Sequence, residues 1–118
     1  PLCGDRVTMD VTLDGTVIEA IGQRVRGCLL CEASSALIAQ NAPGQSADTL
    51  SDLRERVREM LVADDEAAAH GAAETLGDVW QVMETFTPVR GYKSRHECVL
   101  LPFEALAAAV KDAAAQES

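Results

Sequence analysis

Residues 7–15, VTMDVTLDG, alternate apolar and polar side chains strictly as far as Leu13. This period of two predicts a β-strand with one buried face. Asp14-Gly15 follows the strand, and this dipeptide is the strongest short-range signal for a hairpin turn. Residues 16–26 are therefore expected to form the return strand.

The return strand alternates less regularly than the first strand. Ile18 and Ala20 fit its buried face, whereas Ile21 and Val25 fall on the opposite face. A β-bulge would account for this pattern, and so would burial of both faces.

The rest of the chain favours helices. Helices are expected at residues 28–41, 46–63, 76–86 and 103–115. Pro43-Gly44 ends the first of them, and Pro102 opens the last. In the third, Trp80 and Met83 are expected to point inward. Residues 64–73 fit a further helical turn or a mobile loop, and residues 87–97 a basic connection. The expected fold class is α+β, a small antiparallel sheet packed against several α-helices, in a single domain spanning residues 1–118.

Composition excludes several classes of function. The net charge of −9, with ten Lys and Arg residues, argues against nucleic acid as a partner. No apolar run is long enough to span a membrane, and the first residues are not expected to be a secretory signal. Four cysteines in a chain that can build its own core are expected to be reduced thiols in a cytoplasmic setting rather than disulfides.

Hairpin geometry gathers potential ligands at one end of the sheet. A two-residue turn at Asp14-Gly15 places Cys3 opposite Arg26, with Cys28 extending beside Cys3. Asp5 has the same parity as Cys3, so both side chains are expected on one face.

Each candidate also has a plain structural interpretation. A cysteine is often a core residue, and an aspartate after a glycine often shapes a turn. Cys28 and Cys31 form a CxxC at a helix start, without the βαβ setting of a redox protein. His96 fits a local polar role, although it lies two positions from Cys98 and could reach a metal. Six basic residues lie near cysteines in sequence and would favour thiolates: Arg6, Arg24, Arg26, Arg90, Lys93 and Arg95.

Three segments resemble one family. Residues 1–5, Pro-Leu-Cys-Gly-Asp, followed by the alternating strand, resemble the opening of the IscU/SufU/NifU iron–sulfur scaffolds. Residues 26–36, with Cys28 and a small-residue helix, are similar to the second cysteine segment of that family. Residues 95–106, with Cys98, are similar to its third. The resemblance covers nearly the whole chain and is closest to the SufU branch, because the stretch between Cys28 and Cys98 is long and Arg95 stands three residues before Cys98.

The resemblance implies a four-residue site for zinc or a [2Fe–2S] cluster, made of Cys3, Asp5, Cys28 and Cys98. Soft thiolates suit both, and one carboxylate in place of a fourth thiolate would make the site labile.

Roles of the single residues also follow from the resemblance. Cys3 or Cys98 would accept sulfur, with Arg95 in support. Cys31 has no counterpart in the usual three-cysteine pattern, and together with His96 it is retained as an auxiliary candidate.

The resemblance further implies a scaffold or sulfur carrier rather than an ordinary enzyme. It would receive persulfide sulfur from a cysteine desulfurase and pass sulfur or a cluster to recipient apoproteins, as a monomer or weak homo-oligomer. Two alternatives stay open: a SufU-type zinc-dependent sulfurtransferase that builds no cluster, and a thiol–disulfide oxidoreductase using Cys28 and Cys31. The chaperone-binding motif of IscU is only faintly echoed at Pro88-Val89-Arg90, so dependence on a chaperone is left open.

Overall fold

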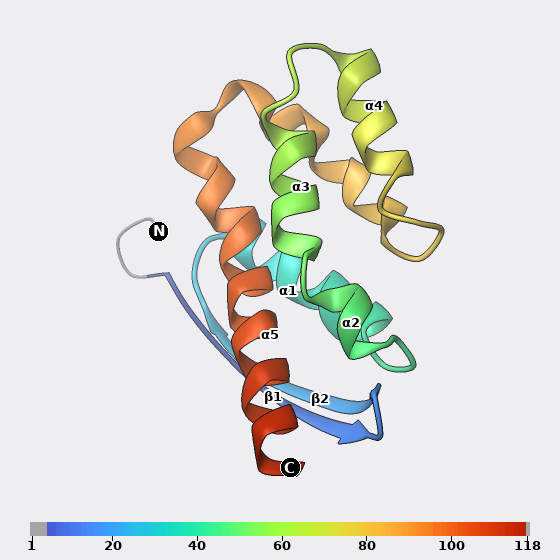
Figure 1. The fold of residues 1–118 in the computed structure, drawn as a ribbon. Coiled ribbons are helices and arrows are strands. Elements are labelled where there is room, and N and C mark those ends of the chain that lie inside the picture. The colour runs from blue at the N-terminus through green and yellow to red at the C-terminus, as the bar shows by residue number, and fades with distance from the viewer. Residues whose placement is uncertain (1–4, 118) are drawn as a thin grey trace.

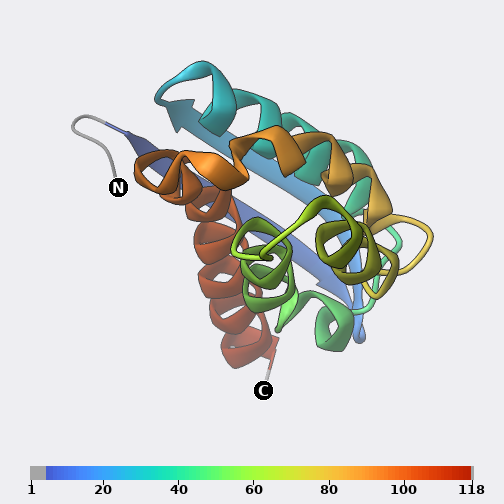
Figure 2. The same cartoon turned by 90° about the horizontal axis from the view of Figure 1, so that it is seen from above.

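The computed structural model describes residues 5–117, which form a two-stranded antiparallel sheet with helices packed against one face (Figure 1). The predicted α+β class is confirmed. The elements follow in the order β1 (Arg6–Asp14), β2 (Val17–Arg26), α1 (Leu29–Asn41), α2 (Ala47–Leu50), α3 (Leu53–Leu61), α4 (Glu66–Glu74), the 3₁₀ helices η1 (Trp80–Gly91) and η2 (Lys93–Arg95), and α5 (His96–Glu117). Helix α5 packs on β1, α1 packs on β2, and the two helices also contact each other; Figure 2 shows α1 and η1 side by side.

Strand β1 has the burial that its sequence predicts. Met9 and Leu13 are buried and Val7 and Val11 are half-buried, while the residues between them are exposed. The turn, however, lies one residue later than predicted. Asp14 pairs with Val17, and Gly15, at φ 65°, is the first of the two turn residues. A positive φ there is adopted readily by glycine.

A bulge at Glu19 sets the register of the whole hairpin. Leu13 pairs with Ile18 but Thr12 pairs with Ala20, so Glu19 is the extra residue. One extra residue reverses which side chains face the core. The predicted bulge is therefore confirmed, and the assignment of Ala20 to the buried face is wrong, because Ala20 is exposed while Ile21 is half-buried.

The later turn and the bulge together change the predicted cross-strand pairing. Arg26 pairs with Arg6 and not with Cys3. Cys3 itself lies outside the described residues, but Asp5 still precedes the β1 end that adjoins the end of β2.

Helices α2 and α3 replace the single helix expected at 46–63. Ser46 caps α2 by accepting a hydrogen bond from the Thr49 backbone N–H at 3.2 Å. The break falls at Ser51, whose hydroxyl donates to the Asp48 carbonyl at 2.8 Å. Serine side chains compete for backbone groups in this way and favour helix ends. Residues 64–73, left open between helix and loop, lie largely in α4, which Asp65 caps.

Residues 80–91 form a 3₁₀ helix rather than the short α-helix predicted for 76–86. Its buried residues Trp80, Met83 and Phe86 recur at every third position, which is the period of a 3₁₀ helix. Trp80 and Met83 point inward as predicted, and the Trp80 ring meets that of Phe103 edge-on at 6.2 Å between centroids.

Helix α5 begins at His96, seven residues before the predicted start, and Pro102 lies inside it. Proline has no N–H for the Cys98 carbonyl, which normally costs stability within a helix. Burial of Val99, Leu100 and Phe103 on both sides of Pro102 offsets this cost. The early start places Cys98 in the first turn of α5. None of the described helices is long and apolar enough to cross a membrane.

An exposed histidine ties α4 to η1. His70 Nδ1 bonds to the Glu84 carboxylate, and His70 Nε2 lies 3.4 Å from a Glu74 carboxylate oxygen. The hydrogen bond with Glu84 raises the pKa of His70 above its usual value, and the same hydrogen bond lowers the pKa of Glu84.

We expect this contact to stabilise the fold fully below about pH 6.5, the ordinary histidine value, and to fade as pH rises through the raised pKa of His70. Thermal unfolding should therefore show His70→Gln less stable than the wild type at pH 6, with the difference shrinking towards pH 9. An equal difference at both pH values would contradict this.

Candidate metal centre

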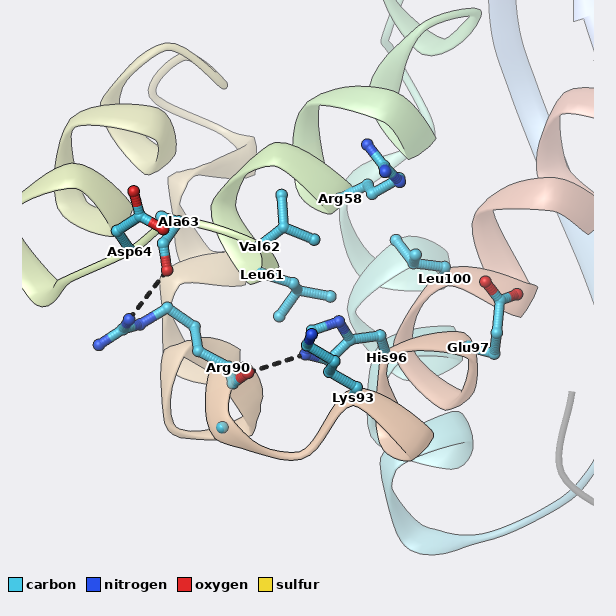
Figure 3. A pocket seen from close by; sticks show the side chains of 11 residues that line it. Arg58, Leu61, Val62, Ala63, Asp64, Arg90, Lys93, His96, Glu97 and Leu100 are labelled. Carbon is cyan, nitrogen blue, oxygen red and sulfur yellow. Dashed lines mark hydrogen bonds between the residues drawn. The ribbon is translucent and has the colours of Figure 1, made fainter.

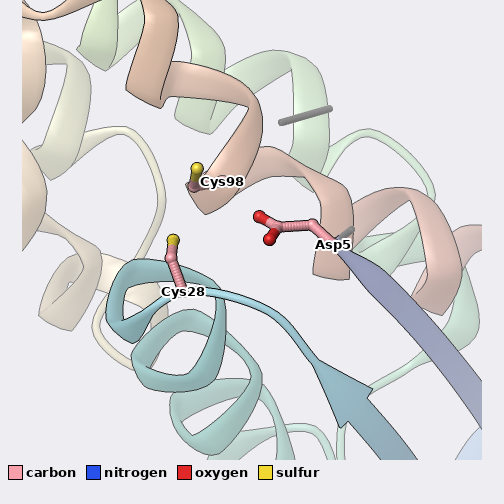
Figure 4. Close-up of side chains that lie close together, drawn as sticks. All are labelled: Asp5, Cys28 and Cys98. Carbon is pink, nitrogen blue, oxygen red and sulfur yellow. The ribbon is translucent and has the colours of Figure 1, made fainter. Parts of the chain in front are cut away.

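Three segments distant in sequence meet at one end of the molecule (Figure 4). Asp5 immediately precedes β1, Cys28 is the N-cap residue of α1, and Cys98 lies in the first turn of α5. One carboxylate oxygen of Asp5 and the two sulfur atoms all lie within 4.8 Å of one another. These atoms are close enough to share one metal ion.

Local structure explains why the three side chains converge. The Cys28 side chain makes no capping hydrogen bond with α1, so its sulfur is free to face the site. Helices α1 and α5 both present their N-terminal ends to the site, where the helix dipole favours negative charge. Thiolates and a carboxylate are the charges that such an environment stabilises.

Gly27 allows the hairpin to approach α1. A Cβ atom at residue 27 would lie 3.0 Å from Asp5 Cγ, 3.1 Å from Asp5 Oδ1 and 3.1 Å from Cys31 Cβ. Sequence reasoning did not single out this glycine for a role in the site. The signal was present, because Gly27 stands between the end of a strand and the cysteine that opens a helix.

A second contact that sequence reasoning missed joins the two helices of the site. The buried Ser34 hydroxyl donates to the Val99 carbonyl at 2.7 Å, and so ties α1 to the first turn of α5. The small-residue run at 33–36 was its only signal, because small side chains permit close helix approach.

One oxygen of the Asp5 carboxylate lacks a hydrogen-bond partner in the part of the chain that the structure describes. Its Oδ2 atom is buried and has no hydrogen-bond partner among the described residues. A buried carboxylate oxygen in this state is costly, and a bound cation would remove the cost. An unpartnered carboxylate oxygen beside two sulfur atoms fits a site that binds a metal cation.

Burial also disfavours the charged form of the Cys98 thiol. Burial, followed by the hydrogen bond with Cys28, raises the pKa of Cys98 to about 12, whereas a hydrogen bond with Arg95 acts in the opposite direction. A metal binds the thiolate and therefore has to displace the proton. The donor set fits zinc or an iron–sulfur cluster, because both take thiolates and tolerate an oxygen ligand.

Cys3, the fourth predicted ligand, lies outside the described residues, and its role stays a prediction. Arg95 lines a shallow hollow with Cys28, Leu29 and Leu30, at the accessible side of Cys28. Its supporting role also stays a prediction.

The two auxiliary candidates lie outside the converging group that the described residues form. Cys31 is fully buried one turn into α1, and burial raises its pKa to about 11. His96 Nε2–H donates to the Val89 and Arg90 carbonyls at 3.1 and 3.2 Å, which anchors the end of η1 to α5. Neither residue joins Asp5, Cys28 and Cys98 in the candidate metal centre.

Known proteins resemble this chain over most of its length. It is 26% identical over 106 residues to the zinc-dependent sulfurtransferase SufU of Bacillus subtilis, which covers 90% of this chain and 67% of that protein. It is 28% identical over 114 residues to the iron–sulfur cluster assembly scaffold protein IscU of Streptococcus pyogenes, covering 97% of this chain and 67% of that one. No family model matches the chain.

A solved structure extends this likeness to the fold. The N-terminal part of a NifU-like protein from Brucella abortus superposes with a TM-score of 0.79 and 30% identity, over 98% of this chain and 74% of that one. The chain belongs to the IscU/SufU/NifU family. The resemblance stated from the three cysteine segments is thereby confirmed.

Gly27 offers a test of the geometry in this family member. Gly27→Ala should weaken zinc binding by about 10–100-fold, because the new Cβ displaces Asp5 and the start of α1. Gly22→Ala is the matched control, since a Cβ there would meet nothing within 4 Å. Competition with a chromophoric chelator gives both affinities, and equal affinities for the two variants would contradict the close approach at Gly27.

Proposed function

We propose that this chain accepts persulfide sulfur from a cysteine desulfurase and passes sulfur or a [2Fe–2S] cluster to apoproteins. The observation that carries the proposal is the convergence of the Asp5 carboxylate with the sulfurs of Cys28 and Cys98. Its relatives are named as a scaffold and as a zinc-dependent sulfurtransferase, and both descriptions fit such a site. Residues 1–118 would act as one domain, in a cytoplasm that keeps its thiols reduced.

Sulfur acceptance requires a nucleophilic thiolate in the site. A thiolate of Cys98 or Cys3 attacks the terminal sulfur of the desulfurase persulfide. One S–S bond forms on the acceptor, the original S–S bond breaks, and the desulfurase cysteine leaves as a thiolate. Among the described residues, Arg95 is suited to support this step at Cys98, because its hydrogen bond favours the thiolate.

Bound zinc would supply a positive charge that stabilises thiolates in the site. Asp5, Cys28 and Cys98 would hold it, with Cys3 as the proposed fourth ligand. The cluster, where one is assembled, would be cargo held by the same residues. Zinc-dependent sulfur transfer without cluster assembly is the second candidate, and the zinc-dependent relative favours it.

The thiol–disulfide oxidoreductase alternative has less support. Such an enzyme needs an accessible thiolate in its CxxC. The accessible thiol of the pair, Cys28, groups with Asp5 and Cys98 as a potential metal ligand, and Cys31 does not belong to that group.

Sulfur acceptance can be measured directly. After incubation with a cysteine desulfurase and cysteine, mass spectrometry of the alkylated chain should show a mass increase of one sulfur, and metal analysis should show about one zinc per chain. An ultraviolet–visible charge-transfer band after anaerobic reconstitution would favour the scaffold, and its absence the sulfurtransferase. A metal-free chain that gains no sulfur and forms a reversible Cys28–Cys31 disulfide would overturn the proposal.

Asp5 tests whether the site is built to release its cargo. A carboxylate ligand exchanges more readily than a thiolate, so Asp5→Ala should slow the transfer of a [2Fe–2S] cluster to apo-ferredoxin by roughly tenfold. If Asp5 only shapes the chain before β1, the variant should instead lose its cluster faster than the wild type. The two roles predict opposite signs after equal reconstitution.

A further inference from the structure

A groove of about 640 Å³ lies between the C-terminal end of α3 and the segment that leads into α5 (Figure 3). Apolar side chains from both elements line part of it, namely Leu61 and Val62 from the end of α3 and Leu100 from α5. Val62 is 49% exposed, whereas Leu61 and Leu100 are buried, so Val62 is the apolar side chain of this lining that solvent reaches. A small-molecule site normally encloses most of its ligand, and the openness of this groove suits a segment of another protein better.

Three cationic side chains also line the groove: Arg58, Arg90 and Lys93. They are three of only ten Lys and Arg residues in a chain of net charge −9. These three cations locally offset the overall negative charge of the chain. A negatively charged partner would therefore be repelled less at the groove than elsewhere on the surface.

Two of these cations have no carboxylate partner in the described part of the chain. Arg90 donates from Nη1 to the Ala63 carbonyl at 3.1 Å, and its Nε–H is buried with no acceptor there. Lys93 is exposed and forms no ion pair with residues 5–117. Arg58, by contrast, pairs with Glu55 at 3.1 Å.

The groove also has acidic residues at its margin, and only one of them lacks a cationic partner. Glu97 lies 3.5 Å from Arg54, so its charge is offset. Asp64 forms no ion pair with the described residues. Among the described residues, the groove lining therefore has two cations without a carboxylate partner, Arg90 and Lys93, and one unpaired carboxylate, Asp64, so its unpaired charge is positive.

The groove adjoins the candidate metal centre through one short segment. Lys93 lines the groove, Arg95 lines the hollow beside Cys28, and Cys98 follows three residues later. Two large apolar side chains near this segment are strongly exposed: Leu29, next to Cys28, is 83% exposed, and Tyr92 is 66% exposed. Exposed apolar side chains rimmed by charge are typical of protein docking surfaces.

We propose that the groove between α3 and α5 binds an acidic segment of the cysteine desulfurase. Carboxylates of that segment pair with Lys93 and Arg90, and an apolar side chain covers the exposed Val62. The inference rests on the proposed function, because it names where the sulfur donor for the same centre is held. Anchoring beside the metal centre would orient the donor persulfide and speed association.

The test compares two charge reversals in the zinc-loaded chain. Lys93→Glu and Lys111→Glu both change net charge from −9 to −11, and both lysines are exposed, but Lys111 lies in α5 away from the groove lining. The probe is a purified cysteine desulfurase, with Kd measured calorimetrically at low and high salt. Lys93→Glu should raise Kd about tenfold at low salt and Lys111→Glu less than about twofold, with the difference shrinking at high salt.

The outcomes separate this inference from the function on which it rests. Equal Kd values for the wild type and Lys93→Glu would contradict desulfurase binding at the groove and would leave the proposal of sulfur acceptance standing. If both variants weakened desulfurase binding equally, the effect would come from net charge, and binding at the groove would be contradicted. A wild-type chain that neither binds the desulfurase nor gains sulfur from it would overturn both proposals. Unchanged zinc content and thermal unfolding in each variant control for folding.

Discussion

The close approach of the hairpin end to the first turns of α1 and α5 is the constraint on which the candidate centre depends. A side chain at residue 27 would crowd Asp5 and Cys31, because even its Cβ would lie within 3.0–3.1 Å of their atoms. The Ser34–Val99 hydrogen bond holds the two helices together at the same end. Close packing therefore excludes solvent from Cys98 and from one oxygen of Asp5, and leaves that oxygen without a hydrogen-bond partner among the described residues.

This arrangement has two opposing consequences for sulfur chemistry. Burial raises the pKa of Cys98 to about 12 and so opposes formation of the nucleophilic thiolate. The helix N-termini, Arg95 and a bound metal all act in the opposite direction. Zinc would thus do more than hold the chain segments together, because it would also stabilise the thiolates that receive sulfur. Access is available on the side of Cys28, which is half-buried, next to Leu29 and Arg95.

Sequence alone predicted the features that depend on local pattern. The alternation in β1, the start of α1 near Cys28 and the α+β class all follow from periodicity and turn residues. The features it missed depend on tertiary contacts. The bulge was expected but its position was not, and its extra residue moved Ala20 to solvent. The later turn and the bulge together removed the predicted pairing of Cys3 with Arg26. Pro102 was taken as a helix start, because no local rule shows that core burial on either side lets α5 continue through it.

We propose that Asp5 shares a metal ion with Cys28, Cys98 and a further thiolate from Cys3. X-ray absorption spectroscopy of the zinc-loaded chain measures this directly, because sulfur and oxygen ligands differ in distance from zinc. We expect three sulfur atoms at about 2.3 Å and one oxygen at about 2.0–2.2 Å from zinc, with one sulfur lost in Cys98→Ser. A shell of four sulfur atoms, or a spectrum unchanged by Cys98→Ser, would contradict it.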